Sequence, residues 1–476
     1  MRSTLLLGVV AMATATTLLH CASSDESPPP DAGPGSDASP SPDAGVDLDA
    51  DASDATTEDE LEIPDSAVVC ETSPCAIAIT GVRSANRSFG RFCALLEDKS
   101  VQCWGSNNKK GLGYEIDGGA SMSSSPHPIP SLTGVTNVSL GGDNACARVE
   151  DGSVYCWGDP ALVSAGTDRD GGPPLVSPAL PTRQDLVPTS ASVAVGQGTA
   201  CVILEGGGVS CWGRNESLQL AQRTTDRFGP PTSIPTGERT LSFVWPGGNP
   251  DLRIFAPDGW VFASATSGEL LSWGASRCSV PNQCSYILGR DSSEDPDPIP
   301  GIVPGLVRVR GMASGRQHVC AIVGREVSCW GDNSLGQLGR GSAADRSELP
   351  APTILSAIAA ADDVDAGVPP RVDVPLQIVA DANSSTYVVM SSGRVYGWGP
   401  GPNNTTRPRY EWGRPARLDA PSGPVVAIAT TSDTFCALLR TGAVECWGNN
   451  FLGTLGRGID DTAYTDPKPA QVVFSH

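Results

Sequence analysis

Cysteines are the residues whose type and spacing could do chemistry in this chain of 476 residues. Fifteen are present, and ten of them fall into five close pairs. Four pairs are ten residues apart and the fifth is nine apart: Cys93 and Cys103, Cys146 and Cys156, Cys201 and Cys211, Cys436 and Cys446, and Cys320 and Cys329. Thiols spaced in this way can form disulfides across hairpins or act as thiolate ligands of zinc.

The elements that must position these pairs are seven copies of one segment. Each copy reads as an apolar strand, a turn rich in Asp, Gly or Ser, and a second apolar strand ending in Trp-Gly, which is typical of a β-hairpin. The copies are Phe92–Gly105, Ala145–Gly158, Ala200–Gly213, Val261–Gly274, Val319–Gly331, Thr386–Gly399 and Phe435–Gly448. Paired cysteines are therefore predicted to face one another across two neighbouring strands.

The two copies without cysteine support disulfides. They lose both partners together and hold Phe262 with Ser272 and Tyr387 with Gly397. Loss in pairs is what a cross-strand disulfide predicts, and strand pairing brings the two Cα atoms within bonding range. By elimination, Cys70 with Cys75 and Cys278 with Cys284 complete seven local bridges. Zinc is the alternative, but C-x-x-C is absent and a hairpin pair supplies two ligands where a structural site needs four.

Further β-prone stretches precede the hairpins, so each repeat supplies three or four strands. Seven such repeats predict an all-β chain folded as a seven-bladed β-propeller. The 54 glycines and 41 prolines agree with many short strands joined by turns. A propeller must close its ring, and we expect Ala76–Thr80 and Ala470–Phe474 to share one blade. The repeated Trp is expected to pack between blades, and a stacking platform for sugars or bases is the alternative.

Gly315–Ile322 followed by Val327–Gly341 resembles the regulator-of-chromosome-condensation repeat. Asn449–Gly458 repeats the second half of that run closely, and the resemblance covers roughly residues 70 to 476. It implies the seven-bladed fold, and it implies that His318 ties strands together. The family's eponymous role is nucleotide exchange on a small GTPase with chromatin binding. Export, disulfides and acidity oppose that role here.

The N-terminus predicts export. Met1-Arg2 and the short apolar run Leu5–Ala13 are typical of a signal peptide, and Leu18 three residues before Cys21 resembles the lipobox of bacterial lipoproteins. A small residue is usual where His20 stands. Because Ala22 is not the inner-membrane retention signal Asp, the resemblance implies an outer-membrane lipoprotein, periplasmic or surface-facing. The alternative is a soluble secreted protein cut nearby, and lipidation of Cys21 would leave an even fourteen cysteines to pair.

A linker is predicted to follow. Residues 22–66 hold fourteen acidic residues and no Lys or Arg, with almost no large apolar side chain. Such a composition cannot bury enough surface to fold. The predicted organisation is a signal peptide (1–20), a disordered linker (21–66) and the propeller (67–476). With a net charge of −21, the chain is a poor candidate for nucleic-acid binding.

Catalytic and metal-binding patterns are missing. The mature histidines, His127, His318 and His476, are too scattered for a metal cluster, and no serine-hydrolase, zinc-protease or phosphate-loop motif is present. We expect no catalytic residue, cofactor or metal. The acidic runs Asp291–Asp297 and Asp362–Asp365 are interpreted as solvated surface acids.

Loops that vary over a rigid scaffold are where propellers carry recognition. Candidates are the Cys278–Cys284 loop, the insertion Ser342–Val374 and the segment Pro400–Trp412. The last offers four side chains of the types favoured at binding hot spots: Arg407, Arg409, Tyr410 and Trp412.

The sequence therefore predicts a non-catalytic, lipid-anchored binding propeller at the bacterial cell envelope. Its partner would be an envelope or extracellular protein or a glycan, it would touch the membrane through its anchor only, and it would be a monomer. An envelope propeller enzyme, a lyase or hydrolase with its site at the ring mouth, is the alternative. Inhibition of a secreted enzyme is a narrower variant, by resemblance to the secreted propeller that inhibits β-lactamases.

Overall fold

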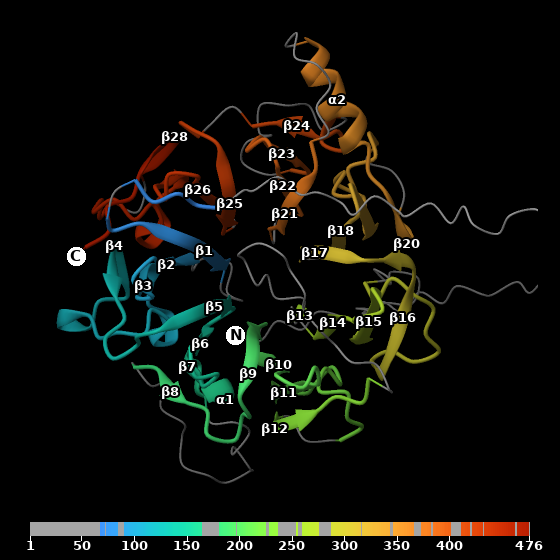
Figure 1. Cartoon of the computed structure of the whole chain (residues 1–476), viewed down its shortest axis with the longest axis horizontal. Coiled ribbons are helices and arrows are strands. Elements are labelled where there is room, and N and C mark those ends of the chain that lie inside the picture. The colour runs from blue at the N-terminus through green and yellow to red at the C-terminus, as the bar shows by residue number, and fades with distance from the viewer. Residues whose placement is uncertain are drawn as a thin grey trace, which may run out of the picture. The chain divides into compact units, whose positions relative to one another are not determined.

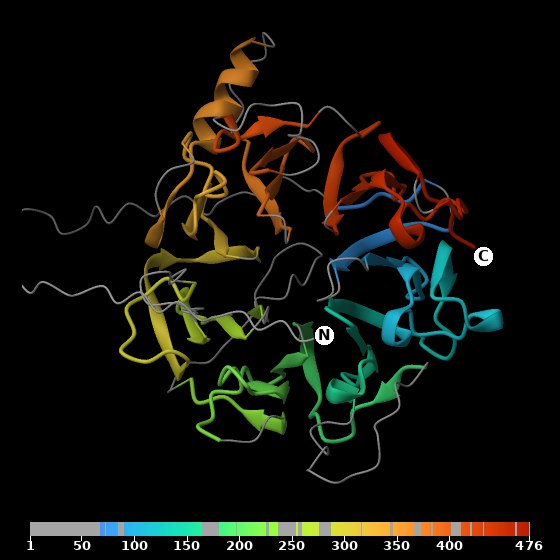
Figure 2. The same ribbon diagram turned by 180° about the vertical axis from the view of Figure 1, so that it is seen from behind.

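Seven four-stranded antiparallel sheets stand around a central axis (Figure 1 and Figure 2). The computed structural model describes residues 67–475 apart from 72, 84–89, 164–179, 197, 225–227, 237–253, 256–258, 276–286, 316, 343–345, 366–372, 382–383, 401–410, 419–420, 432 and 462–463. These residues belong to one compact unit. The predicted seven-bladed β-propeller is confirmed.

Blades are numbered in chain order, and each is built from four consecutive strands. The strands of blades 1 to 3 are β1 (Ala76–Arg83), β2 (Gly90–Leu96), β3 (Val101–Ser106) and β4 (Met122–Pro128); β5 (Val135–Gly141), β6 (Asn144–Val149), β7 (Val154–Gly158) and β8 (Thr182–Arg183); and β9 (Ser190–Val195), β10 (Thr199–Leu204), β11 (Val209–Arg214) and β12 (Phe228–Ser233).

The strands of blades 4 to 7 follow the same order. They are β13 (Ile254–Phe255), β14 (Trp260–Ser264), β15 (Glu269–Gly274) and β16 (Asp297–Val307); β17 (Val309–Ser314), β18 (His318–Val323), β19 (Glu326–Gly331) and β20 (Ser347–Pro352); β21 (Pro375–Ala380), β22 (Thr386–Met390), β23 (Val395–Trp398) and β24 (Ala416–Arg417); and β25 (Val425–Thr430), β26 (Thr434–Leu439), β27 (Val444–Asn449) and β28 (Thr465–Gln471).

The second and third strands of each blade form the predicted hairpin. In all five cysteine-bearing hairpins the two cysteines are directly opposed, including Cys320 and Cys329, where the turn is one residue shorter. Tyr387 faces Gly397 in blade 6. A Cβ atom at Gly397 would lie 2.7 Å from Cδ1 of Tyr387, so the aromatic ring fills the space that a disulfide takes in other blades.

Ring closure differs from our expectation. The segment Ala76–Thr80 lies in blade 1 and Ala470 in blade 7, so no blade is shared. The expectation was wrong because every repeat supplies all four of its own strands, which leaves none to exchange. The ends instead clasp neighbouring blades: the side-chain amide of Gln102 donates to the Ser475 carbonyl at 2.6 Å and accepts from the Ser475 N–H at 3.1 Å.

The antiparallel order gives the ring two distinct faces. One, which we call the turn face, carries the β-hairpin turns such as Glu97–Ser100 and the connections between blades. The other, which we call the loop face, carries the longer connections between third and fourth strands, such as 107–121. The first described residues enter on the turn face, because Val69 donates its N–H to the Arg440 carbonyl at 2.7 Å, in the hairpin turn of blade 7.

Among the described residues, two α-helices interrupt the all-β pattern, α1 (Pro160–Val163) and α2 (Leu355–Asp365), together with the short 3-10 turns Asn108–Lys110, Asp117–Gly119 and Phe451–Gly453. Helix α2 projects at the rim of the ring, between β20 and β21 (Figure 1). It was not predicted, because its alanine-rich run lies in a segment read as a surface loop. Within the described residues, none of the helices has the length and apolar character needed to cross a bilayer.

Candidate functional site

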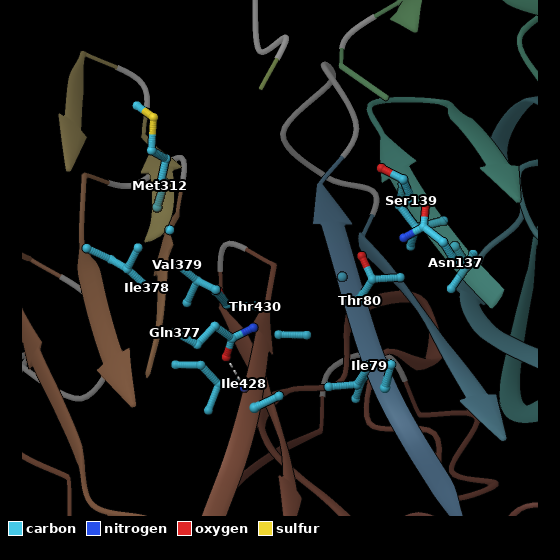
Figure 3. A pocket seen from close by; sticks show the side chains of 18 of the residues that line it. Ile79, Thr80, Asn137, Ser139, Met312, Gln377, Ile378, Val379, Ile428 and Thr430 are labelled. Carbon is cyan, nitrogen blue, oxygen red and sulfur yellow. Dashed lines mark hydrogen bonds between the residues drawn. The ribbon is translucent and has the colours of Figure 1, made fainter. Parts of the chain in front are cut away.

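A cavity of about 360 Å³ opens along the ring axis (Figure 3). The innermost strands of blades 1, 2, 5, 6 and 7 supply most of its wall. The residues of these strands that line the cavity are mostly β-branched or small, because seven strands converge on the axis and leave little room for long side chains. Ile79, Ile378 and Ile428 provide apolar surface, and Thr80 and Thr430 add hydroxyl groups. A concave site of this size suits a small ligand or a short segment of a partner.

The described lining of this cavity is uncharged. It contains no Asp, Glu, Lys, Arg, His or Cys and no aromatic ring. Its hydroxyl groups have no base beside them among these residues, so the described wall offers no nucleophile–base pair or carboxylate pair. The wall can therefore bind by shape and hydrogen bonds.

Side-chain amides bridge the innermost strands of neighbouring blades. Oδ1 of Asn137 in blade 2 accepts the N–H of Val193 in blade 3 at 3.1 Å. Oε1 of Gln377 in blade 6 accepts the N–H of Ile428 in blade 7 at 2.7 Å (Figure 3). Both acceptors cover a strand edge that would otherwise present a free amide. These bridges were not predicted from the sequence, although Gln377 stands out as a polar residue in the otherwise apolar strand Pro375–Ala380.

The repeated Trp residues pack between blades, as predicted. All seven are buried, with at most 3% of the residue exposed. Five donate the indole N–H to a backbone carbonyl of the preceding blade, at 2.8 to 3.0 Å. The five pairs are Trp104 with Thr454, Trp157 with Gly111, Trp273 with Gln219, Trp330 with Ile287, and Trp398 with Gln337. A stacking platform for sugars or bases is thus excluded at these positions.

Two of these indoles have no acceptor. The Nε1 atoms of Trp212 and Trp447 are buried without a hydrogen-bond partner. In the other five cases the accepting residue stands immediately before a Leu of the preceding blade, which Gly follows in four cases and Ala in the fifth, Leu220-Ala221. Blades 2 and 6, which precede Trp212 and Trp447, have no Leu-Gly or Leu-Ala pair after their Trp-Gly. The sequence difference thus accompanies the loss of the acceptor.

A second set of ties uses the residue that opposes the Gly of Trp-Gly. His318 is fully buried, and its Nε2 lies 2.8 Å from Oγ1 of Thr386 in the next blade. Burial lowers the pKa of His318 to about 4, although the charge of Asp332 acts in the opposite direction. His318 is therefore structural, as expected, and the two strands that it ties, β18 and β22, belong to neighbouring blades.

Arg91 takes the same position in blade 1. It is fully buried, and its guanidinium donates to the carbonyls of Gly142 and Asn144 in blade 2, at 2.8 and 3.0 Å. Burial lowers the pKa of Arg91 to about 10, with Asp143 opposing the shift. Because its guanidinium bonds to two backbone carbonyls of the next blade, Arg91 stabilises the junction between blades 1 and 2.

Six of the seven predicted cysteine pairs lie within bonding distance in the structure, with Cα atoms 4.1 to 5.7 Å apart. The seventh, Cys278 with Cys284, lies outside the described residues. Among the described residues, one group of metal-ligand types gathers, Cys70, Cys75 and Glu97. Its two sulfur atoms are joined to one another, so they are not thiolate ligands.

The predicted binding residues are described only in part. Arg407, Arg409 and Tyr410 lie outside the described residues, as do Cys21 and the linker. Trp412 is half-buried, and its carbonyl accepts the N–H of Gly399 at 2.8 Å. Its side chain is therefore less available than a free loop residue would be.

The acidic runs are not simply solvated, which corrects our interpretation. Asp363 and Asp373 both pair with Arg394, at 2.6 and 2.7 Å, and fix the end of α2 against blade 6. Asp297 is buried and pairs with Arg290 at 2.9 Å. Arg394 lies in the hairpin turn between β22 and β23, and sequence alone could not place it beside the end of α2.

Comparisons with known proteins agree with this architecture. Residues 135–161 match the family model for the regulator of chromosome condensation (RCC1) repeat. The chain is 25% identical over 312 residues to the mitochondrial RCC1 domain-containing protein RUG3 of Arabidopsis thaliana, covering 63% of this chain and 62% of RUG3. It is 25% identical over 277 residues to the ultraviolet-B receptor UVR8 of the same plant, covering 56% and 54%. The chain thus spans less than two thirds of the length of these relatives.

Solved structures resemble the chain in fold. Prp20p from Saccharomyces cerevisiae, whose binding to Gsp1p and histones has been studied, superposes with a TM-score of 0.61 at 19% identity, over 79% of this chain and 86% of Prp20p. Human WBSCR16 superposes with a TM-score of 0.59 at 18% identity, over 78% and 88%. The chain is a seven-bladed β-propeller that contains an RCC1-type repeat and resembles RCC1-type propellers, an architecture that suggests a binding or scaffold role.

Proposed function

We propose that this protein is a non-catalytic binding propeller held at the bacterial cell envelope by a lipid on Cys21, and that it recognises an exported protein. The observation that supports the proposal is the face of the ring on which the first described residues lie. The described chain enters on the turn face, where Val69 bonds to the hairpin turn of blade 7. A tether on that face leaves the long connections of the loop face free to meet a partner.

Three further features support a binding role. The described cavity wall is uncharged and offers no acid–base pair. Two fully buried side chains that can carry charge, His318 and Arg91, form hydrogen bonds across junctions between blades. An acidic linker of about 45 residues, with a mean reach of roughly 35–40 Å if flexible, would carry the propeller clear of the lipid surface.

Site-directed photo-crosslinking of the full chain in the cells that produce it tests the proposal. A photoreactive amino acid at Lys109 or Phe451 samples exposed positions of the loop face, and one at Gly206 or Arg325 samples exposed positions of the turn face. We expect protein adducts from the first two positions and at least tenfold fewer from the matched pair. Equal yields from both faces, or adducts from neither, would contradict the proposal, as would turnover of an envelope substrate by the purified chain.

A further inference from the structure

The innermost strand of each blade has one edge that no strand covers. Its other edge pairs with the second strand of the same blade, so its outward N–H and C=O groups are not used within that blade. In blades 3 and 7 side chains of the preceding blade cap amides of this edge. Asn137 accepts the N–H of Val193, and Gln377 accepts the N–H of Ile428. These amides are not available to a ligand.

The strand registers identify the equivalent positions in the other blades. Asn137 pairs with Arg148 and Gln377 with Val389, in both cases directly after the register shift at the start of the innermost strand. The residues at this position in blades 1, 5 and 7 are Ala78, Gly311 and Ala427. None of the three side chains carries an acceptor atom. The edge amides that they would cover, those of Val138, Ile378 and Ile79, therefore lack the side-chain cap.

The three uncapped residues all line the axial cavity. An edge residue of this kind presents an N–H and a C=O side by side, which matches the alternating acceptor and donor of an extended peptide. A bare anion would use the N–H groups but would be repelled by the carbonyls. A glycan would lack the aromatic surface that commonly supports sugar rings, because the described wall has none. A charged side chain would find no opposite charge there.

We propose that the axial cavity binds an extended, uncharged peptide segment of a partner protein, which pairs as an added strand with the uncapped edge of β1 or β21. This inference rests on the proposed function in taking the partner to be a protein. Side chains that suit the wall are β-branched, such as Val and Thr, since Ile79, Ile378 and Thr80 form it. Asn137 and Gln377 then act as specificity-determining residues, because they close the neighbouring edges and leave few registers to a peptide.

The test uses the full chain as isolated, labelled with ¹⁵N-isoleucine, and the blocked peptide acetyl-Thr-Val-Thr-Val-Thr-amide as probe. We expect the probe to shift the amide signals of Ile79 or Ile378 and to slow their hydrogen exchange. The signal of Ile428 is the internal control, because Gln377 already holds that amide at 2.7 Å. The matched control peptide carries N-methyl groups on both valines, which keeps the side chains and removes two backbone donors. It should bind at least about tenfold more weakly.

Two substitutions move the cap. Gly311→Asn gives blade 5 the side-chain amide that Asn137 gives blade 2, so the new side chain can accept the N–H of Ile378. The substitution should weaken probe binding at the β21 edge about tenfold. A Cβ atom there lies 3.3 Å from the flexible end of Ile322, so the site has room after a small adjustment. Gln377→Ala does the opposite, because it frees the amide of Ile428 and should make that signal respond to the probe. The second variant and the N-methylated peptide keep the test decisive if Gly311→Asn fails to fold.

Equal binding of the N-methylated peptide, equal shifts at Ile428 and Ile79 in the unmodified chain, or no shift at millimolar probe would overturn the inference. These outcomes are distinct from failure of the proposed function. Loop-face crosslinks without probe binding would remove the peptide site and leave a binding propeller. Probe binding without crosslinks would keep the peptide site and remove the loop face as the recognition surface.

Discussion

Replacing Trp330 by alanine is expected to lower the free energy of unfolding by about 3–5 kcal/mol. The residue is completely buried at the junction of blades 5 and 4, where its ring meets Phe262 edge-on at a centroid distance of 6.0 Å. Its indole N–H also donates to the Ile287 carbonyl at 2.8 Å. The substitution opens a cavity and leaves that carbonyl unpaired. Urea denaturation followed by circular dichroism measures the loss.

A matched pair of phenylalanine variants separates the hydrogen bond from the packing. Trp330→Phe removes an indole N–H that has an acceptor, and Trp447→Phe removes one that has none. Both side chains are buried at the same position of the repeat, so their packing losses are similar. We expect Trp330→Phe to cost about 1–3 kcal/mol more than Trp447→Phe. Equal costs would show that the indole bond does not help to hold neighbouring blades together.

Lowering the pH is expected to destabilise the propeller through His318. Burial holds the pKa of His318 at about 4 in the folded chain, against about 6.5 when unfolded. Between these values the unfolded chain binds one more proton than the folded chain, so stability falls as the pH falls. The contribution is complete above pH 6.5, and about 3 kcal/mol of it is lost by pH 4.

The variant His318→Gln isolates this effect from the carboxylates that titrate in the same range. Glutamine can still bond to Thr386 but takes up no proton, so the difference in stability between the two proteins should narrow as the pH is lowered from 7 to 4. Urea midpoints at pH 7, 5.5 and 4.5 give that difference. A constant difference across the three pH values would contradict a lowered pKa, because it would mean that His318 takes up its proton equally in the folded and unfolded chains.

The repeat made much of the fold predictable. Seven copies ending in Trp-Gly acted as an internal alignment, and a fixed hairpin register predicted that Cys320 faces Cys329 despite the shorter turn. The role of the Trp residues followed for the same reason, because a ring of identical units must bury the same side chain at each junction. These features depend on periodicity, which a single sequence displays.

Features that break the period could not be predicted in this way. The hydrogen bond from the Ile428 N–H to Gln377 joins the innermost strands of neighbouring blades, although the two residues are 51 positions apart in sequence. The ion pairs of Arg394 with Asp363 and Asp373 likewise join segments whose spacing follows no repeat. Closure through Gln102 and Ser475 links residues 373 positions apart. The residue types at those positions are common ones, so the sequence does not indicate that they contact one another.

Intact mass and a non-reduced peptide map of the protein isolated from its own membranes test the central claim most directly, namely an exported, disulfide-braced binding propeller. We predict a chain that begins at an acylated Cys21 and holds seven local disulfides, including Cys278 with Cys284. Free thiols throughout, together with an unprocessed Met1, would contradict the account and favour an intracellular role.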